Sequence, residues 1–258
     1  MADAVCSSHD GNCGKVSVQP SIISLENVHK WYNGQHVLRG ICMTVMQGEC
    51  VVVCGSSGSG KSTLLRCISG LEEYQKGCIV VNGVNLKGDR KKRKDIHRHV
   101  GIVFQQFNLF PHLSVYRNCT LALLWVRRLS KQEAHNLTMH HLAQVHMVDH
   151  VNKYPHQLSG GQQQRAAIAR TLCMEPKIIL FDEPTSSLDP EMAKEVLGTI
   201  INLAKGGVTI ICVTHEMGFA SSIADAVVFI EEGAIVENRK TEDFFQNPQT
   251  TRAKLFLG

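Results

Sequence analysis

The chain has 258 residues, of which 43% are hydrophobic and 19% are charged, and its formal net charge is +4. This composition excludes a disordered chain, because it supplies enough apolar side chains for a sizeable core. The net charge is too small to indicate a nucleic-acid-binding protein by itself. No apolar run approaches the roughly 18 to 20 residues needed to cross a bilayer, so any role at a membrane is expected to be peripheral.

The first twenty residues differ in character from the rest of the chain. Residues 1–20 have neither the basic start nor the apolar centre of a secretory signal. We expect them to form a flexible tail before a single domain over residues 21–258. The ten cysteines include no Cys-x-x-Cys pair and no cysteine–histidine spacing typical of zinc sites, which indicates reduced thiols.

From residue 22 onward, short runs rich in valine and isoleucine alternate with longer amphipathic stretches, the pattern of a sheet with crossover helices. We expect buried strands at residues 50–54, 78–81, 100–104, 177–181, 208–213 and 226–230. Residues 107–157 contain no such run and are predicted to be helical. The fold class is therefore α/β, with a helical insertion.

The stretch GSSGSGKST fits the phosphate-loop pattern G-x-x-x-x-G-K-[ST], directly after the strand at 50–54 and before an amphipathic helix. Glycines let backbone N–H groups and a helix N-terminus surround phosphate oxygens. Lys61 is expected to supply positive charge to those oxygens, and Ser62 a hydroxyl ligand to Mg²⁺. The predicted nucleotide-binding residues of this loop are Gly55, Ser56, Ser57, Gly58, Ser59, Gly60, Lys61, Ser62 and Thr63, and the loop alone leaves kinases and GTPases open.

Two further predicted strands end in polar residues. The strand at 177–181 leads into Asp182 and Glu183, and the strand at 208–213 leads to His215. The carboxyl ends of parallel strands open onto one ligand crevice. We expect Asp182 to contribute to a Mg²⁺ shell, Glu183 to polarise an attacking water, and His215 to contact the γ-phosphate and hold that water. The other twelve histidines are expected to be structural.

A basic run at Arg90, Lys91, Lys92, Arg93 and Lys94, followed by Arg98, stands out along the chain. The favoured interpretation is a solvated loop or helix face, and the alternative is an anionic partner such as lipid headgroups or RNA. No aromatic residues interleave the run to stack bases.

The stretch LSGGQQQR at residues 158–165 is a second glycine-rich segment. Ser159 followed by Gly160 and Gly161, and then by good helix formers, predicts an N-cap at a helix whose first turn lacks side chains. That is another potential anion site. Two such sites can serve two nucleotides, or one nucleotide from opposite sides, and the second arrangement requires a partner subunit if the loop cannot reach its own phosphate loop.

Several motifs together resemble those of ABC ATPases. The phosphate loop, Gln105, LSGGQ at 158–162, FDEP at 181–184, SSLD at 186–189 and His215 occur in the family's order and approximate spacing. The resemblance implies a P-loop NTPase of the RecA-like type with a mixed sheet, at about residues 21–105 and 165–258, and an inserted α-helical subdomain at about 106–164. It also implies a head-to-tail dimer around two ATP molecules. Each ATP would contact the phosphate loop of one chain and the other chain's Leu158, Ser159, Gly160, Gly161 and Gln162.

The resemblance also implies roles for individual residues. Tyr32 is similar to the aromatic residue that stacks on adenine, with Trp31 as the alternative. Gln105 would reach Mg²⁺ and sense the γ-phosphate, and Asp189 would act across the dimer interface. Ser56 and Ser187 stand where relatives commonly have proline and alanine, but neither difference removes a catalytic group.

Longer segments of the sequence resemble those of the importers of polar or general L-amino acids: HKWYNGQHVLRGI, VFQQFNLFPHLSV, LALLWVRR and NKYPHQLSGGQQQRAAIAR. The implied partners are two integral membrane permeases and, indirectly, a periplasmic amino-acid-binding protein, at the cytoplasmic face of a bacterial inner membrane. No nucleic-acid partner is expected. The alternative is an ABC-type ATPase coupled to a cell-division or nucleic-acid complex.

Four residues next to Gln105 are candidates for the permease-docking surface: Phe107, Leu109, Phe110 and Pro111. The alternative is that these side chains form an ordinary buried cluster.

Overall fold

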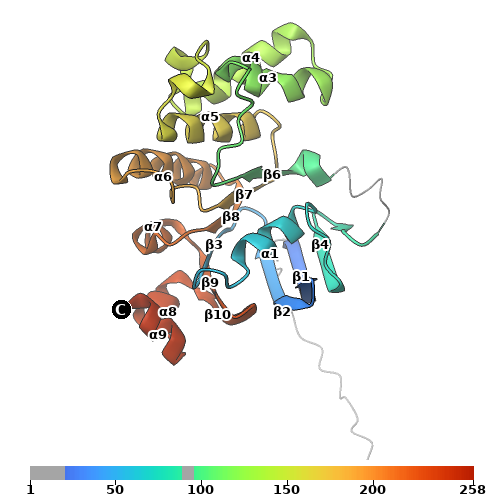
Figure 1. The fold of residues 1–258 in the computed structure, drawn as a ribbon, viewed down its shortest axis with the longest axis vertical. Coiled ribbons are helices and arrows are strands. Elements are labelled where there is room, and N and C mark those ends of the chain that lie inside the picture. Colours follow the sequence, from blue (N-terminus) through green and yellow to red (C-terminus); the bar gives the residue numbers. More distant parts are fainter. Residues whose placement is uncertain (1–20, 89–95) are drawn as a thin grey trace, which may run out of the picture.

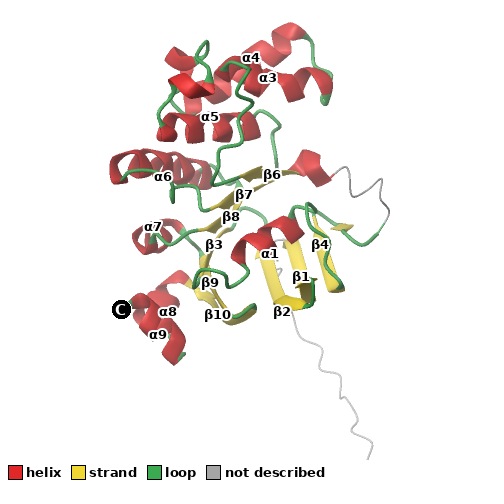
Figure 2. Cartoon of the chain, viewed as in Figure 1, coloured by secondary structure: helices red, strands yellow, loops and turns green. Residues whose placement is uncertain are grey.

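The computed structural model describes residues 21–88 and 96–258 (Figure 1). The expected tail at residues 1–20 and the basic run at residues 90–94 lie outside the described residues, whereas Arg98 lies within them. Figure 2 shows strands at the centre and lower part of the view and helices above and to one side of them.

The strands form two sheets. The first is antiparallel and contains four strands in the order β2 (Gln35–Met46), β1 (Ser21–Tyr32), β4 (Lys76–Val81) and β5 (Val84–Asn85). The second contains six strands in the order β10 (Ala234–Lys240), β9 (Ala226–Glu231), β3 (Cys50–Cys54), β8 (Thr209–Val213), β7 (Ile178–Asp182) and β6 (Val100–Val103). Its pairs are parallel, except for the antiparallel pair β9–β10.

The expected α/β core with a mixed sheet is confirmed, and five of the expected strands match β3, β6, β7, β8 and β9. The expected strand at 78–81 also exists, but it is not part of the parallel core. It belongs to β4, which pairs antiparallel with β1 in the first sheet. The apolar run there reflects half-burial in an antiparallel sheet, where alternate residues face the core, rather than burial on both faces.

Alternate residues of the central strands face opposite sides of the second sheet. Val51 and Val53 of β3 belong to one buried cluster with residues of helix α1 (Lys61–Ile68) and of the antiparallel sheet. Cys50 and Val52 belong to a second cluster with residues of five helices. These are α3 (Val115–Trp125), α4 (Lys131–Gln144), α5 (Gly160–Leu172), α6 (Pro190–Lys205) and α7 (Met217–Ile223). Helix α1 and helix α5 therefore lie in layers on opposite faces of the sheet.

The expected helical character of residues 107–157 is confirmed by α3, α4 and two short 3₁₀ turns, η1 (Val148–His150) and η2 (Pro155–Gln157). Ser114 and Ser130 cap α3 and α4, which explains where these helices begin. The expected subdomain limit at residue 164 falls inside α5, which packs against α3 and α4 and also against α6.

The chain ends in helices α8 (Thr241–Gln246) and α9 (Thr251–Leu257), which pack near β9 and β10 through a third small cluster around Phe229 and Phe244. Across the described residues 21–88 and 96–258, none of the helices has both the length and the apolar character needed to span a bilayer.

Candidate active site

Three neighbouring parallel strands bring the expected active-site residues to one edge of the six-stranded sheet. β8 lies between β3 and β7, and Val213 of β8 pairs with Val53 of β3 and with Asp182 of β7. The three strands therefore end level with one another. The phosphate loop follows β3, His215 follows β8, and Asp182 and Glu183 lie at the end of β7, so these side chains share the edge at which ligands of such sheets bind.

Two glycines of the phosphate loop cannot be replaced without a backbone shift. Gly55 has φ = +144°, and a Cβ atom there would overlap the carbonyl oxygen of Ile230. Gly60, which precedes α1, has φ = +101°, and a Cβ atom would lie 2.9 Å from the carbonyl oxygen of Val37. A loop without side chains at these points is the backbone cradle that phosphate groups require, so the residues fit a nucleotide.

The amine of Lys61 lies inside this cradle. Its Nζ donates hydrogen bonds to the carbonyl oxygens of Gly55, at 3.0 Å, and of Ser56, at 2.8 Å. Burial lowers the pKa of Lys61, and the carboxylates of Glu183 and Asp182 oppose that shift. The positive charge is thus aimed at the centre of the loop, where phosphate oxygens would replace the carbonyls as its partners.

Ser62 and Asp182 form the predicted pair for a divalent cation. The Ser62 hydroxyl donates to Oδ1 of Asp182 at 2.7 Å. Burial raises the pKa of the Asp182 carboxyl, whereas the hydroxyl of Ser62 and the charge of Arg66 lower it. A buried carboxylate and a hydroxyl, side by side, form an oxygen donor set of the kind that Mg²⁺ prefers.

Glu183 and His215 face each other across the strand ends. Oε1 of Glu183 lies 3.3 Å from Nε2 of His215, and both side chains are partly exposed. The backbone of Glu183 is left-handed, with φ = +48°, and its N–H donates to the carbonyl of Val213 at 3.0 Å. This turn directs the side chain toward His215, and its partial exposure leaves room for a water molecule beside the carboxylate.

Gln105 lies two residues after the end of β6 and is exposed. The Ser187 hydroxyl donates to the carbonyl oxygen of Gln105 at 3.2 Å, which ties the segment after β6 to the segment after β7. Ser187 therefore has a structural partner.

Tyr32 and Trp31 end β1 and lie on opposite faces of the antiparallel sheet. Trp31 stacks on His36, with 4.1 Å between ring centroids. Tyr32 lies near the phosphate loop: burial and the Glu72 carboxylate raise the pKa of its phenol, and the hydroxyl of Thr63 lowers it. Of the two aromatic residues, Tyr32 is the one with a neighbour in the phosphate loop.

The signature segment, defined here as residues 158–162, begins α5 as the sequence predicts. The N–H of Gln162 donates to Oγ of Ser159 at 3.3 Å, and Oε1 of Gln162 accepts from the N–H of Ser159 at 3.1 Å. This reciprocal capping box fixes both residues. Nε2 of Gln162 also donates to Nε2 of His150 at 3.2 Å. The sequence does not predict this contact, because no motif distinguishes His150 from the histidines that were expected to be structural.

The glycines of the signature segment lie close to the start of α6. A Cβ atom added at Gly160 would lie 2.8 Å from Cδ2 of Leu188. A Cβ atom added at Gly161 would lie 2.9 Å from Cβ of Met192. Asp189 caps α6 by accepting hydrogen bonds from the N–H groups of Glu191 and Met192. Since α5 and α1 lie on opposite faces of the sheet, the signature segment and the phosphate loop of one chain belong to different layers (Figure 1).

The four candidate docking residues have different environments. Phe107 and Asn108 have left-handed backbones, and their carbonyl oxygens accept hydrogen bonds from the guanidinium of Arg170. Leu109 is partly buried against the second cluster, Pro111 is exposed, and Phe110 is 43% exposed. The four therefore differ in exposure: Phe107 and Leu109 are partly buried, whereas Phe110 is a large apolar side chain that is exposed.

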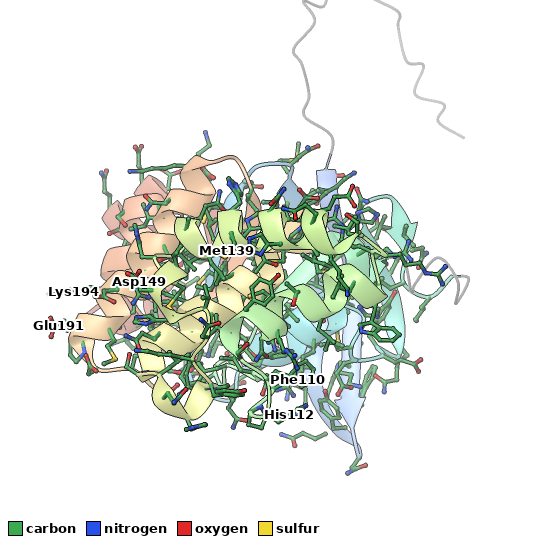
Figure 3. All side chains as sticks on the ribbon, turned by 90° about the horizontal axis from the view of Figure 1, so that it is seen from above. Phe110, His112, Met139, Asp149, Glu191 and Lys194 are labelled. Carbon is green, nitrogen blue, oxygen red and sulfur yellow. The ribbon has the colours of Figure 1, made fainter. Side chains whose placement is uncertain are left out.

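Phe110 lines an apolar groove of about 460 Å³ on the helical side of the molecule. Its other lining residues are Asn118, Leu121, Ala122, Trp125, Val126 and Arg170. Trp125 is 78% exposed. Together with Val126 it also lines a second cavity of about 840 Å³, whose other lining residues include Arg98, Arg127 and Arg128. Figure 3, which views the molecule from this end, shows Phe110 and His112 close together.

Known proteins share both the sequence and the fold. Residues 38–186 match the family model described as ABC transporter. The chain is 57% identical over 242 residues to the general L-amino acid transport ATP-binding protein AapP of Rhizobium johnstonii, covering 94% of each chain. It is 50% identical over 236 residues to the glutamate/aspartate import ATP-binding protein GltL of Escherichia coli K12, covering 92% of this chain and 98% of the relative.

Among solved structures, a dimeric ATP-binding cassette in a post-hydrolysis state, bound to ADP and phosphate, is similar with a TM-score of 0.77 and 33% identity. That match covers 85% of this chain and 98% of the other. A second similar structure is cbiO1 of Clostridium perfringens, part of an ABC transporter complex, with a TM-score of 0.81 and 31% identity. The chain therefore belongs to the ABC transporter family and is one of its ATP-binding ATPase subunits.

Proposed function

We propose that the chain hydrolyses ATP to drive the uptake of L-amino acids through separate membrane permeases. The observation that carries this proposal is the convergence of the phosphate loop, Asp182, Glu183 and His215 on one sheet edge, in a chain with an intact capped signature segment. The relatives described above are amino-acid transport subunits, which favours this function over coupling to a cell-division or nucleic-acid complex.

In this proposal the backbone N–H groups of residues 55–63 and the amine of Lys61 hold the phosphates of ATP. Ser62 and Asp182 would hold Mg²⁺, with Gln105 reaching it from the segment after β6, and the ion would neutralise charge on the phosphate oxygens. Tyr32 supplies an aromatic face to adenine. The 2.7 Å contact between Ser62 and Asp182 supports the cation assignment, because it brings two oxygen ligands together.

Glu183 acts as the general base in this mechanism. Its carboxylate orients a water molecule toward the γ-phosphate and accepts a proton from it. The water oxygen bonds to the γ-phosphorus as the bond from that phosphorus to the bridging oxygen breaks, and ADP leaves with that oxygen. His215, 3.3 Å from that carboxylate, holds the water and the γ-phosphate oxygen in line. Both side chains come from the ends of adjacent strands, so their separation is fixed by the sheet rather than by a flexible loop.

Two copies of the chain close head to tail around two ATP molecules. The signature segment and the phosphate loop of one chain lie in different layers, which supports use of the signature segment by the partner copy. The dimeric cassette bound to ADP and phosphate supports the same arrangement. Asp189, at the start of α6, acts across the interface in this dimer.

The apolar groove lined by Phe110, Leu121, Trp125 and Val126 is our proposed docking surface for the permeases. It is connected to the nucleotide site through Gln105, five residues before Phe110. Closure of the dimer then moves the permeases between inward-facing and outward-facing states. We place the chain at the cytoplasmic face of a bacterial inner membrane, and a periplasmic amino-acid-binding protein delivers the substrate from the other side.

The test is uptake of a panel of labelled L-amino acids by cells that carry Lys61→Ala in place of the parent chain. We expect uptake of acidic, neutral and basic amino acids to fall to background, because Lys61 is needed to hold the phosphates. Lys254→Ala, which removes an exposed lysine of α9, serves as the matched control and should leave uptake unchanged. Unchanged uptake in the Lys61 variant, in cells without a redundant importer, would contradict the amino-acid assignment but not the ATPase activity.

A further inference from the structure

Lys30 is a buried lysine on β1 to which the mechanism above gives no role. The residue is only 5% exposed, whereas lysines are rarely so buried unless they are paired. Its Nζ donates to Oε2 of Glu72 at 3.1 Å and to the carbonyl oxygen of Glu73 at 2.7 Å. Removing an ammonium from water is costly, and a whole buried ion pair can often be replaced by well-packed apolar side chains without loss of stability. The ion pair by itself therefore does not explain why a lysine is used here.

The ammonium of Lys30 also lies over the ring of Tyr32, 4.2 Å from the ring centroid. The two residues are separated by one position on β1, so their side chains lie on the same face of the sheet. A cation at this distance occupies one face of the aromatic ring and is attracted by its π electrons. A planar base can then stack on the opposite face only.

The partners of Lys30 connect Tyr32 to the phosphate loop. Glu72 and Glu73 follow α1, the helix that begins at Lys61. Two residues further on, Gln75 exchanges hydrogen bonds with the backbone of Trp31, at 2.9 Å and 3.1 Å. The segment after α1 therefore holds the end of β1, and the distance between the Tyr32 ring and the phosphate loop is fixed by Lys30 and its neighbours.

We propose that Lys30 is a positioning residue for the nucleobase: its ammonium holds the ring of Tyr32 from one side and orients the other side toward adenine. The cation also withdraws electron density from the ring, which reduces its repulsion of the electron-rich purine. This inference rests on the assignment of Tyr32 to adenine under the proposed function.

The test compares the binding of ATP with the binding of inorganic tripolyphosphate, which has no base. In Lys30→Met we expect the Kd for ATP to rise about fivefold to tenfold, the range of a partly buried cation–π contact, and the Kd for tripolyphosphate to stay the same. The kcat at saturating ATP should change less than about twofold, since the reacting groups lie on other strands. Lys30→Arg keeps the cation and should restore ATP binding.

Lys76→Met is the matched control, because Lys76 lies over the ring of Trp31, 5.7 Å from its centroid, on the other face of the sheet. It should leave the Kd for ATP unchanged. If Lys30→Met does not fold, Glu72→Gln replaces it. Loss of the ion pair leaves the ammonium with the Glu73 carbonyl as its partner and holds it less firmly over the ring, so the Kd for ATP should rise about threefold without a change for tripolyphosphate. An unchanged Kd for ATP in that variant would overturn the inference.

A double-mutant cycle with Tyr32→Leu separates the inference from its premise. If Lys30 acts through Tyr32, adding Lys30→Met to Tyr32→Leu causes no further loss of ATP binding. A loss in Tyr32→Leu but none in Lys30→Met, or an equal loss of ATP and tripolyphosphate in Lys30→Met, overturns the inference alone. If Tyr32→Leu itself binds ATP normally, the adenine assignment is wrong and the inference falls with it, while the ATPase function stands.

Discussion

Replacement of Glu183 by glutamine separates ATP binding from hydrolysis. Glutamine has the same shape as glutamate but cannot accept the proton of the attacking water. Loss of a positioned general base slows a reaction by about 10²- to 10⁴-fold, equivalent to about 3 to 5.5 kcal/mol of activation free energy. The groups that hold the phosphates and Mg²⁺ keep their partners, because Lys61 and Ser62 form hydrogen bonds with the loop carbonyls and with Asp182 rather than with Glu183.

We therefore expect Glu183→Gln to bind ATP as tightly as the parent chain and to accumulate as an ATP-bound dimer. Phosphate release measures kcat, and light scattering at saturating ATP and Mg²⁺ measures the mass relative to the 28.6 kDa monomer. Glu242→Gln, an exposed carboxylate of α8, is the control for loss of one negative charge. A variant that hydrolyses ATP at the parent rate would refute the role of Glu183, and one that stays monomeric would refute the sandwich dimer.

Three further variants test the cation site, the phosphate loop and the docking surface. Burial raises the pKa of the Asp182 carboxyl, so the folded chain binds the carboxyl proton more tightly than the unfolded chain does. Loss of that proton as the pH rises therefore lowers the stability of the folded chain. Asp182→Asn should therefore melt at a higher temperature than the parent at pH 8 in EDTA, with a smaller difference at pH 4; equal melting at pH 8 would contradict this. Gly55→Ala should lose ATP binding and at least about 2 kcal/mol of unfolding free energy in urea, whereas Gly58→Ala, with open space around its Cβ, should lose about 1 to 2 kcal/mol. Phe110→Ala should keep its ATPase rate in isolation but co-purify about tenfold less with the permeases, unlike Leu255→Ala on α9; normal assembly would rule out the docking role.

The parallel core could be predicted from the sequence because its strands are buried on both faces. Such strands appear as continuous apolar runs, as in CVVVC of β3, and the polar residues that follow them mark the site. The antiparallel strands β1 and β2 give a weaker signal, because their apolar residues alternate with polar ones and their register shifts at several bulges. The strand at 78–81 has the opposite problem: its continuous apolar run resembles that of a parallel core strand, although β4 pairs antiparallel with β1.

Contacts between distant polar residues could not be predicted from the sequence. The hydrogen bond between Gln162 and His150 joins α5 to a short 3₁₀ turn, and the pair Lys30–Glu72 joins a strand to a loop 42 positions away. Neither follows from periodicity or from a local motif. Asp189 illustrates another limit: its motif implies a role between subunits, and within one chain the structure gives it the separate role of capping α6.

The segment between Gln105 and Phe110 shows how the nucleotide site can be coupled to the docking groove. Its left-handed residues, Phe107 and Asn108, have little freedom, because both of their carbonyl oxygens accept hydrogen bonds from Arg170. Arg170 lies near the end of α5, the helix that the signature segment begins. In the proposed dimer, we therefore expect a shift of α5 toward the partner's ATP to move the residues that carry Phe110 as well. We expect Phe110 to be sensitive to nucleotides at both sites of that dimer, through Gln105 in its own chain and through α5.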